Sequence, residues 1–273
     1  MIGVELVKLA RRPRSWVSIL LLCALPTLVA VFVAVTHLAP PPGQGPALLS
    51  AVLSSGALFP AAALAIVLPV FLPVAVAVVA GDSIAGEAGS GTLRYLLARP
   101  VGRTRLLVAK LVALVTGTAY LTGIMLFGAQ PVAATPSGLT TSNLAAGATT
   151  LSGTAMSPTE IALRTLGAVS FIVVSMLGVG AIALFLSTVT DSALGAALGA
   201  LAALVTSEVL VTLNAASAVD PYLPTRYWLA WIDFFREPIV WRNIERGFAV
   251  QGVYVVVFLG AAWAHFATKD ITS

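Results

Sequence analysis

Charged side chains are scarce in this sequence, and their scarcity decides the class of protein. They make up 10% of the 273 residues, against roughly 25% in an average soluble domain. A water-soluble fold is excluded, because 15 basic and 11 acidic residues cannot cover the surface it would need. Disorder goes with low hydrophobicity, whereas 59% of this chain is apolar. The remaining class is an integral membrane protein. Long apolar runs favour a helical bundle over a β-barrel.

Residues that carry enzyme chemistry are equally few. The single cysteine, Cys23, allows neither an intrachain disulfide nor a cysteine metal cluster. The two histidines, His37 and His265, are expected at opposite faces of the membrane and cannot share a site. Residues 86–92 have two glycines at phosphate-loop spacing but lack the lysine that reaches the phosphates. We therefore expect no catalytic residue, no metal and no cofactor on this chain.

Six apolar runs are long enough to cross a membrane, since a span needs about 20 mostly apolar residues. The sequence therefore predicts an all-α membrane protein with six transmembrane helices in a single domain, residues 1–273. The predicted spans are residues 16–37, 57–80, 106–129, 164–188, 193–213 and 248–267.

Local signals add detail to two of these spans. Pro60, Pro69 and Pro73 lie in the second run, so we expect that helix to be kinked or partly broken. The fourth run is preceded by Ser157-Pro158-Thr159-Glu160. Ser157 can cap a helix, and Glu160 can reach back to the cap nitrogen.

The distribution of Lys and Arg predicts that both termini are cytoplasmic. With that orientation ten of the 15 basic residues lie inside and five lie outside, and the first outer loop, residues 38–56, has no charge. The net charge of +4 is therefore not a sign of nucleic-acid binding. Ile2, Leu6 and Leu9 share one face of residues 2–12, which indicates an amphipathic helix in the cytoplasmic interface. A plain basic flank is the alternative.

The loop between the second and third runs, residues 82–105, combines an apolar face with basic residues. Leu93, Leu96 and Leu97 follow the helical spacing i, i+3 and i+4, so they would share one face of a short helix. Arg94 would point elsewhere, and Pro100 would end the helix. Such an element either lies on anionic lipid or docks in a groove of a partner.

The same loop resembles the signature of type 2 ABC transporter permeases, the exporter class. It reads Ile-Ala-Gly-Glu from residue 84, Gly-Thr-Leu from 91 and Leu-Leu-Ala-x-Pro from 96, with an arginine at 103 and Ala-Lys at 109–110. The resemblance implies a cytoplasmic coupling helix that docks on a separate ATPase subunit. The residues that would make this contact are Glu87, Gly91, Thr92, Leu93, Leu96, Leu97, Pro100 and Arg103.

The resemblance also implies the partners and the activity. A second permease copy or a paralogue would complete the pathway, ATP and Mg²⁺ would be bound by the ATPase, and the chain would contact membrane lipid but no nucleic acid. The complex would export a hydrophobic or amphipathic substrate (a drug, an antibiotic or a lipid-like molecule) across the bacterial inner (cytoplasmic) membrane. Two alternatives are an ion-coupled secondary transporter that uses Glu208 and a membrane scaffold without transport.

Three features outside the loop's leucines have open roles. Glu87 either pairs with a basic group of this chain or of the ATPase, or it caps a helix start through its charge.

Residues 214–246, the aromatic segment, predict short outer helices between spans five and six. Trp228, Trp231, Phe235 and Trp241 would lie at the outer membrane interface. The resemblance implies that this segment caps the pathway, and simple anchoring is the alternative.

Glu208 is the one carboxylate well inside an apolar run. It lies about 22 Å along the fifth span from residue 193, beside Thr206 and Ser207. An ionisable group at that depth is expected to face protein or a wet cavity. These three residues are therefore a candidate substrate pathway. A polar contact at a dimer interface, or a side chain that reaches out to the membrane surface, explains Glu208 equally well.

Overall fold

The computed structural model describes residues 59–91, 103–128, 150–152, 154–213 and 218–268, and isolated positions between 7 and 35. All described positions within the first predicted span are helical. Most of that span, most of the amphipathic stretch 2–12 and the predicted coupling residues Thr92, Leu93, Leu96, Leu97 and Pro100 lie outside the described residues.

The described elements are helical, and no strand occurs among them. In chain order they are α4 (Phe59–Val67), α5 (Phe71–Gly81), α6 (Ala85–Gly89), α8 (Arg103–Gly128), α11 (Pro158–Val189), α12 (Ala193–Leu213), the 3₁₀ helices η2 (Asp220–Tyr222) and η3 (Trp228–Phe235), and α13 (Trp241–Thr268).

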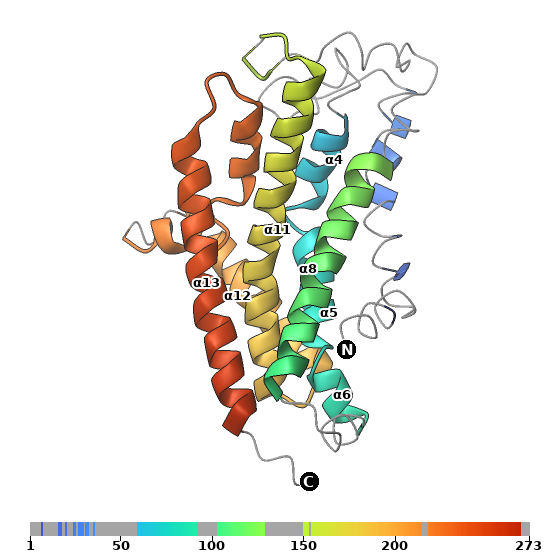
Figure 1. Cartoon of the computed structure of the whole chain (residues 1–273), viewed down its shortest axis with the longest axis vertical. Coiled ribbons are helices and arrows are strands. Elements are labelled where there is room, and N and C mark those ends of the chain that lie inside the picture. Colours follow the sequence, from blue (N-terminus) through green and yellow to red (C-terminus); the bar gives the residue numbers. More distant parts are fainter. Residues whose placement is uncertain are drawn as a thin grey trace.

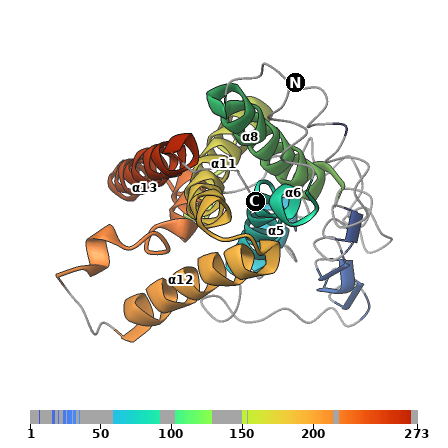
Figure 2. The ribbon, with the colours of Figure 1, turned by 90° about the horizontal axis from the view of Figure 1, so that it is seen from below.

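Helix α11 lies at the centre of the bundle and contacts α5, α8, α12, α13 and η3. Figure 1 shows α8, α11 and α13 running side by side along the long axis, with α6 at the lower end. Seen from below, α12 is drawn almost along its length while α11 and α13 are foreshortened, so α12 is inclined to them (Figure 2). This arrangement gives the molecule a lower end, near α6, and an upper end, near the start of α11.

Three described helices are long and apolar enough to cross a membrane, namely Thr159–Val189, Ala193–Leu213 and Trp241–Thr268. They correspond to the predicted spans four, five and six. The pair α4 and α5 would make a fourth crossing if it traverses the membrane as one broken helix. Helix α8 covers the third predicted span. The total of six spans remains a prediction.

The predicted break in the second span is confirmed. Helices α4 and α5 meet at a bend of 62° across residues 68–70. Pro69 lies in this break and Pro73 lies in the first turn of α5, where its missing N–H is tolerated. Because proline cannot donate the hydrogen bond that would continue the helix, the chain changes direction there.

The predicted start of the fourth span is also confirmed. Ser157 precedes α11 with an extended backbone, and its side chain accepts a hydrogen bond from the backbone N–H of Glu160 at 3.3 Å. In return the backbone N–H of Ser157 donates to Glu160 Oε2 at 2.8 Å. This capping box satisfies two N–H groups that the first helical turn leaves unpaired.

Candidate functional site

A polar joint lies at the lower end of the bundle, where the chain leaves α5. It is formed by Ser83, Glu87, Lys110 and Ser187. The Glu87 carboxylate pairs with the Lys110 ammonium across 3.0 Å, and the two side chains are only 4% and 3% exposed. Lys110 Nζ also donates to the backbone carbonyl of Ser83. The basic partner of Glu87 in this structure thus belongs to the same chain, and it holds α6 against α8.

Ser187, near the end of α11, completes the joint from the opposite side. Its hydroxyl donates to the backbone carbonyl of Gly81 at 2.7 Å and accepts from the backbone N–H groups of Ile84 and Ala85 at 3.1 and 2.8 Å. Ser187 is 1% exposed. One buried side chain therefore satisfies three backbone groups at the connection between α5 and α6.

Apolar contacts from α8, α11 and α13 surround the polar joint. A separate small core packs there, and Trp263 Nε1 of α13 donates to Thr104 Oγ1 of α8 at 3.1 Å. The members of this core are Ile84, Leu106, Leu107, Leu184, Ala262 and Phe266. The turn before α6 is thus packed against α8, α11 and α13 together.

Gly81 allows α5 to approach α12 closely beside the joint. A Cβ atom at this position would lie 2.9 Å from the backbone nitrogen of Ala197 and 3.2 Å from the carbonyl oxygen of Ala193. A side chain would collide with the backbone of α12, which cannot rotate away. At the other side of α6, Gly91 has φ of 69°, a left-handed conformation that glycine adopts without strain. Gly91 and the polar joint thus delimit the start of the predicted coupling loop.

The coupling residues named from the sequence divide between described and undescribed parts. Glu87 is buried in α6, Gly91 is exposed after it, and Arg103 begins α8. The other predicted members lie in residues 92–102, outside the described residues. Sequence reasoning did not identify Ser187, because a serine inside an apolar helix carries no distinguishing pattern.

The candidate pathway residues on α12 do not share a surface. Ser207 is buried and bonds to Thr225 across 2.8 Å. Thr206 and Glu208 are exposed on the single chain, and Thr206 donates to the carbonyl of Ala202 within its own helix. Consecutive residues of a helix project about 100° apart around its axis. The three neighbouring side chains therefore lie on different faces of α12.

The aromatic segment packs into the bundle rather than forming an exposed belt. Trp228, Trp231 and Phe235 are 6%, 0% and 3% exposed and belong to the main core with α11 and α13, whereas Trp241 is 54% exposed. Asp233, which the α-helical pattern puts on the opposite face, is also buried. Residues 228–235 form a 3₁₀ helix, and all of them except Leu229 are buried because α11 and α13 both pack against it.

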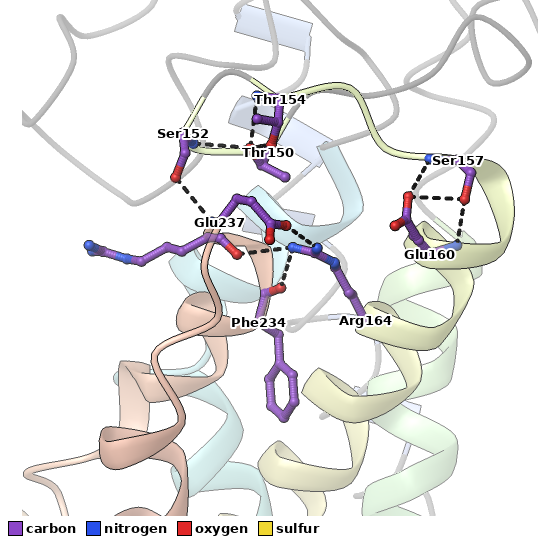
Figure 3. A network of polar contacts seen from close by, with 9 residues as sticks. Thr150, Ser152, Thr154, Ser157, Glu160, Arg164, Phe234 and Glu237 are labelled. Atoms are coloured by element: carbon purple, nitrogen blue, oxygen red, sulfur yellow. Dashed lines mark hydrogen bonds and ion pairs between the residues drawn. The ribbon is translucent and has the colours of Figure 1, made fainter.

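Arg164 fastens this segment to α11 at the upper end. Its guanidinium donates to the backbone carbonyls of Phe234 and Arg236 at 3.2 and 3.0 Å and pairs with the Glu237 carboxylate. Figure 3 shows that Glu237 is also reached by Ser152, whose hydroxyl accepts from the Glu237 backbone N–H at 3.0 Å. The sequence revealed Arg164 only as an outer basic residue, because its partners lie about 70 positions away.

Comparison with known proteins identifies the family of the chain. The family model described as ABC-2 family transporter protein matches residues 1–190, which include α4 to α11 and the whole joint. A comparison with curated proteins found no match. The family match covers well over half of the 273 residues. The chain therefore belongs to the ABC-2 family of transporter proteins.

Proposed function

We propose that this chain is the membrane-spanning permease subunit of an ATP-driven exporter, and that residues 82–105 transmit force from a separate ATPase subunit. The observation that carries the proposal is the polar joint. Glu87, Lys110 and Ser187 attach the start of the loop to α8 and α11 through buried contacts. A push on the loop would therefore move these helices instead of bending a flexible connection.

In this proposal the lower end faces the cytoplasm. The end of α5, the start of α8 and the ends of α11 and α13 meet there, as expected if neighbouring spans run in opposite directions. Arg103, Arg105 and Lys110 begin α8 at the same end, in agreement with the excess of basic residues on the cytoplasmic side. Both termini would then be cytoplasmic, in a bacterial inner membrane.

The ATPase would hold ATP and Mg²⁺ and supply the energy. This chain would supply the docking face, for which we propose Leu93, Leu96 and Leu97 on one face of a short helix. Gly91 would let the backbone turn into that helix. A second permease copy or a paralogue would form the other half of the pathway, and the apolar walls would suit a hydrophobic or amphipathic substrate that moves outward.

The test is co-purification of an affinity-tagged chain with its ATPase from native membranes. We expect Leu96→Asp together with Leu97→Asp to remove the ATPase from the pull-down, because two charges cannot enter an apolar groove. The matched control, Leu96→Met with Leu97→Met, keeps the apolar face and should retain the ATPase. Both chains should be inserted in equal amounts. Recovery of the ATPase with the aspartate pair would refute the proposed docking face.

A second measurement separates the alternatives. Transport that persists without ATP, and that Glu208→Gln abolishes, would favour an ion-coupled transporter. A chain that purifies without an ATPase and moves no substrate would favour a scaffold. The exposed position of Glu208 on the single chain favours neither alternative.

A further inference from the structure

A second buried polar contact lies far from the joint, in the middle of the bundle. Residues 223–227 connect η2 to η3 without regular helix, and the first three of them, residues 223–225 (the buried turn), are buried. Gln251 of α13 lies beside this turn, ten residues after the start of α13, which is about 15 Å along the helix axis. In Figure 1 the described chain from residue 218 to the start of η3 is seen at mid-height, and η3 then rises beside α11 and α13.

These buried backbone groups need hydrogen-bond partners inside the protein, because buried groups cannot bond to the surroundings of the molecule. Gln251 Nε2 donates to the carbonyl of Pro224 at 2.6 Å. Ser207 of α12 accepts from the backbone N–H of Thr225 at 3.4 Å, and their hydroxyls are 2.8 Å apart. The N–H of Leu223 donates to the carbonyl of Asp220 at 3.2 Å. Side chains from two helices thus hold the turn in place.

The third helix, α11, contributes Gly178. A Cβ atom at Gly178 would overlap Gln251 Oε1, so a larger residue there would displace the Gln251 amide from its present position between α11 and α13. Gln251 is 2% exposed, and its Oε1 has no hydrogen-bond partner among the described residues. One amide therefore joins α11, α13 and the buried turn, but it leaves a buried acceptor unsatisfied. The unsatisfied Oε1 weakens the described arrangement, because a buried acceptor without a hydrogen bond is unfavourable.

We infer that Gln251, Gly178 and Ser207 form a lock that holds the buried turn between α11, α12 and α13 in the described state, and that the lock opens during transport. Gln251 is a positioning residue in this inference: it fixes where the turn lies. The part concerning transport rests on the proposed function, since an exporter must move its spans relative to one another. The existence of the lock rests on the contacts alone.

The lock is tested with a thiol probe in the buried turn. In a Cys23→Ser background, Leu223→Cys is the only thiol, and its labelling by a polar maleimide in permeabilised membranes reports exposure of the turn. We expect Gln251→Leu and Gly178→Ala to raise the labelling rate about tenfold, the effect of losing about 1.4 kcal/mol of closure. The control is Gly252→Ala, because a Cβ there meets nothing within 4 Å. Equal rates in all variants would refute the lock.

Opening during the cycle is tested by closing the lock covalently. Ser207→Cys with Thr225→Cys, also in the Cys23→Ser background, replaces two hydroxyls that are 2.8 Å apart and should form a disulfide on oxidation. We expect the oxidised complex to lose its ATP-driven turnover and a reductant to restore it, with the single Ser207→Cys variant unaffected by either treatment. Full ATPase activity in the oxidised pair would overturn opening. The cysteine pair also tests opening of the lock if Gln251→Leu fails to fold.

The two hypotheses fail in different ways. A chain that purifies without an ATPase refutes the proposed function and, with it, opening of the lock during transport. The maleimide rates would still decide whether the lock exists, because they need neither ATP nor substrate.

Discussion

For the buried ion pair between Glu87 and Lys110 we can predict how substitutions change the free energy of unfolding. Both side chains are less than 5% exposed and their charged atoms are 3.0 Å apart. Removing one charge leaves the other buried without compensation, which costs about 3–5 kcal/mol. Replacing both residues by uncharged side chains of similar volume changes the free energy of unfolding little. We therefore expect Glu87→Gln and Lys110→Met each to lower the free energy of unfolding by about 3–5 kcal/mol, and the double variant to lower it by less than either single change.

The assay is unfolding of the purified chain in mixed micelles titrated with SDS, followed by tryptophan fluorescence. Trp231 is fully buried, so its emission should report loss of the core. A matched control is Arg226→Gln, because Arg226 is 44% exposed in its pair with Asp220 and such pairs contribute about 0–1 kcal/mol. The reasoning is refuted if the double variant loses as much stability as the two single variants added together.

Three further changes test contacts at the two ends of the bundle. Ser187→Ala should cost about 1–3 kcal/mol by leaving buried backbone groups unpaired, whereas Ser170→Ala, at an exposed serine bonded within its own helix turn, should have little effect in the same SDS titration. Gly81→Ala should force α5 away from α12 and reduce the yield of monodisperse protein on size exclusion, whereas Gly260→Ala, with open space around it, should leave the yield unchanged. Arg164→Leu should release the aromatic segment and speed proteolysis near residue 237, with no change in cleavage at the lower end.

Signals that depend on neighbouring residues were predictive. Pro69 and Pro73 predicted the break between α4 and α5, since the missing N–H acts where the proline lies. Ser157 and Glu160 predicted the capping box, because both halves of that motif are three residues apart. The low charge predicted a membrane protein, and the motif from residue 84 predicted the family that the comparison confirmed.

Contacts between distant residues were not predictable in the same way. Ser187 lies more than 100 residues from the turn it satisfies, and Gln251 lies 27 residues from Pro224. Nothing in an apolar helix distinguishes a serine or glutamine with such a partner from one that bonds within its own turn. The role of Glu208 stays a prediction, as does the docking face at Leu93.

The aromatic segment forms the predicted short helix but is more deeply buried than its spacing indicated, and its place at the outer membrane interface stays a prediction. Its spacing predicted a short helix with an apolar face, and residues 228–235 do form a helix. Helices on more than one side cover it, however, so Trp231 and Asp233 are both buried. Gly167 contributes to this burial, because its missing Cβ leaves room for the ring of Phe234.

Helix α11 carries Arg164 near one end and Ser187 near the other. They are separated by about 35 Å of continuous helix, and no break interrupts the residues between them. A continuous helix of this kind is stiff along its axis, since each peptide group is hydrogen-bonded to the next turn. An axial displacement of one end of α11 would therefore be transmitted to its other end without a relay of side chains.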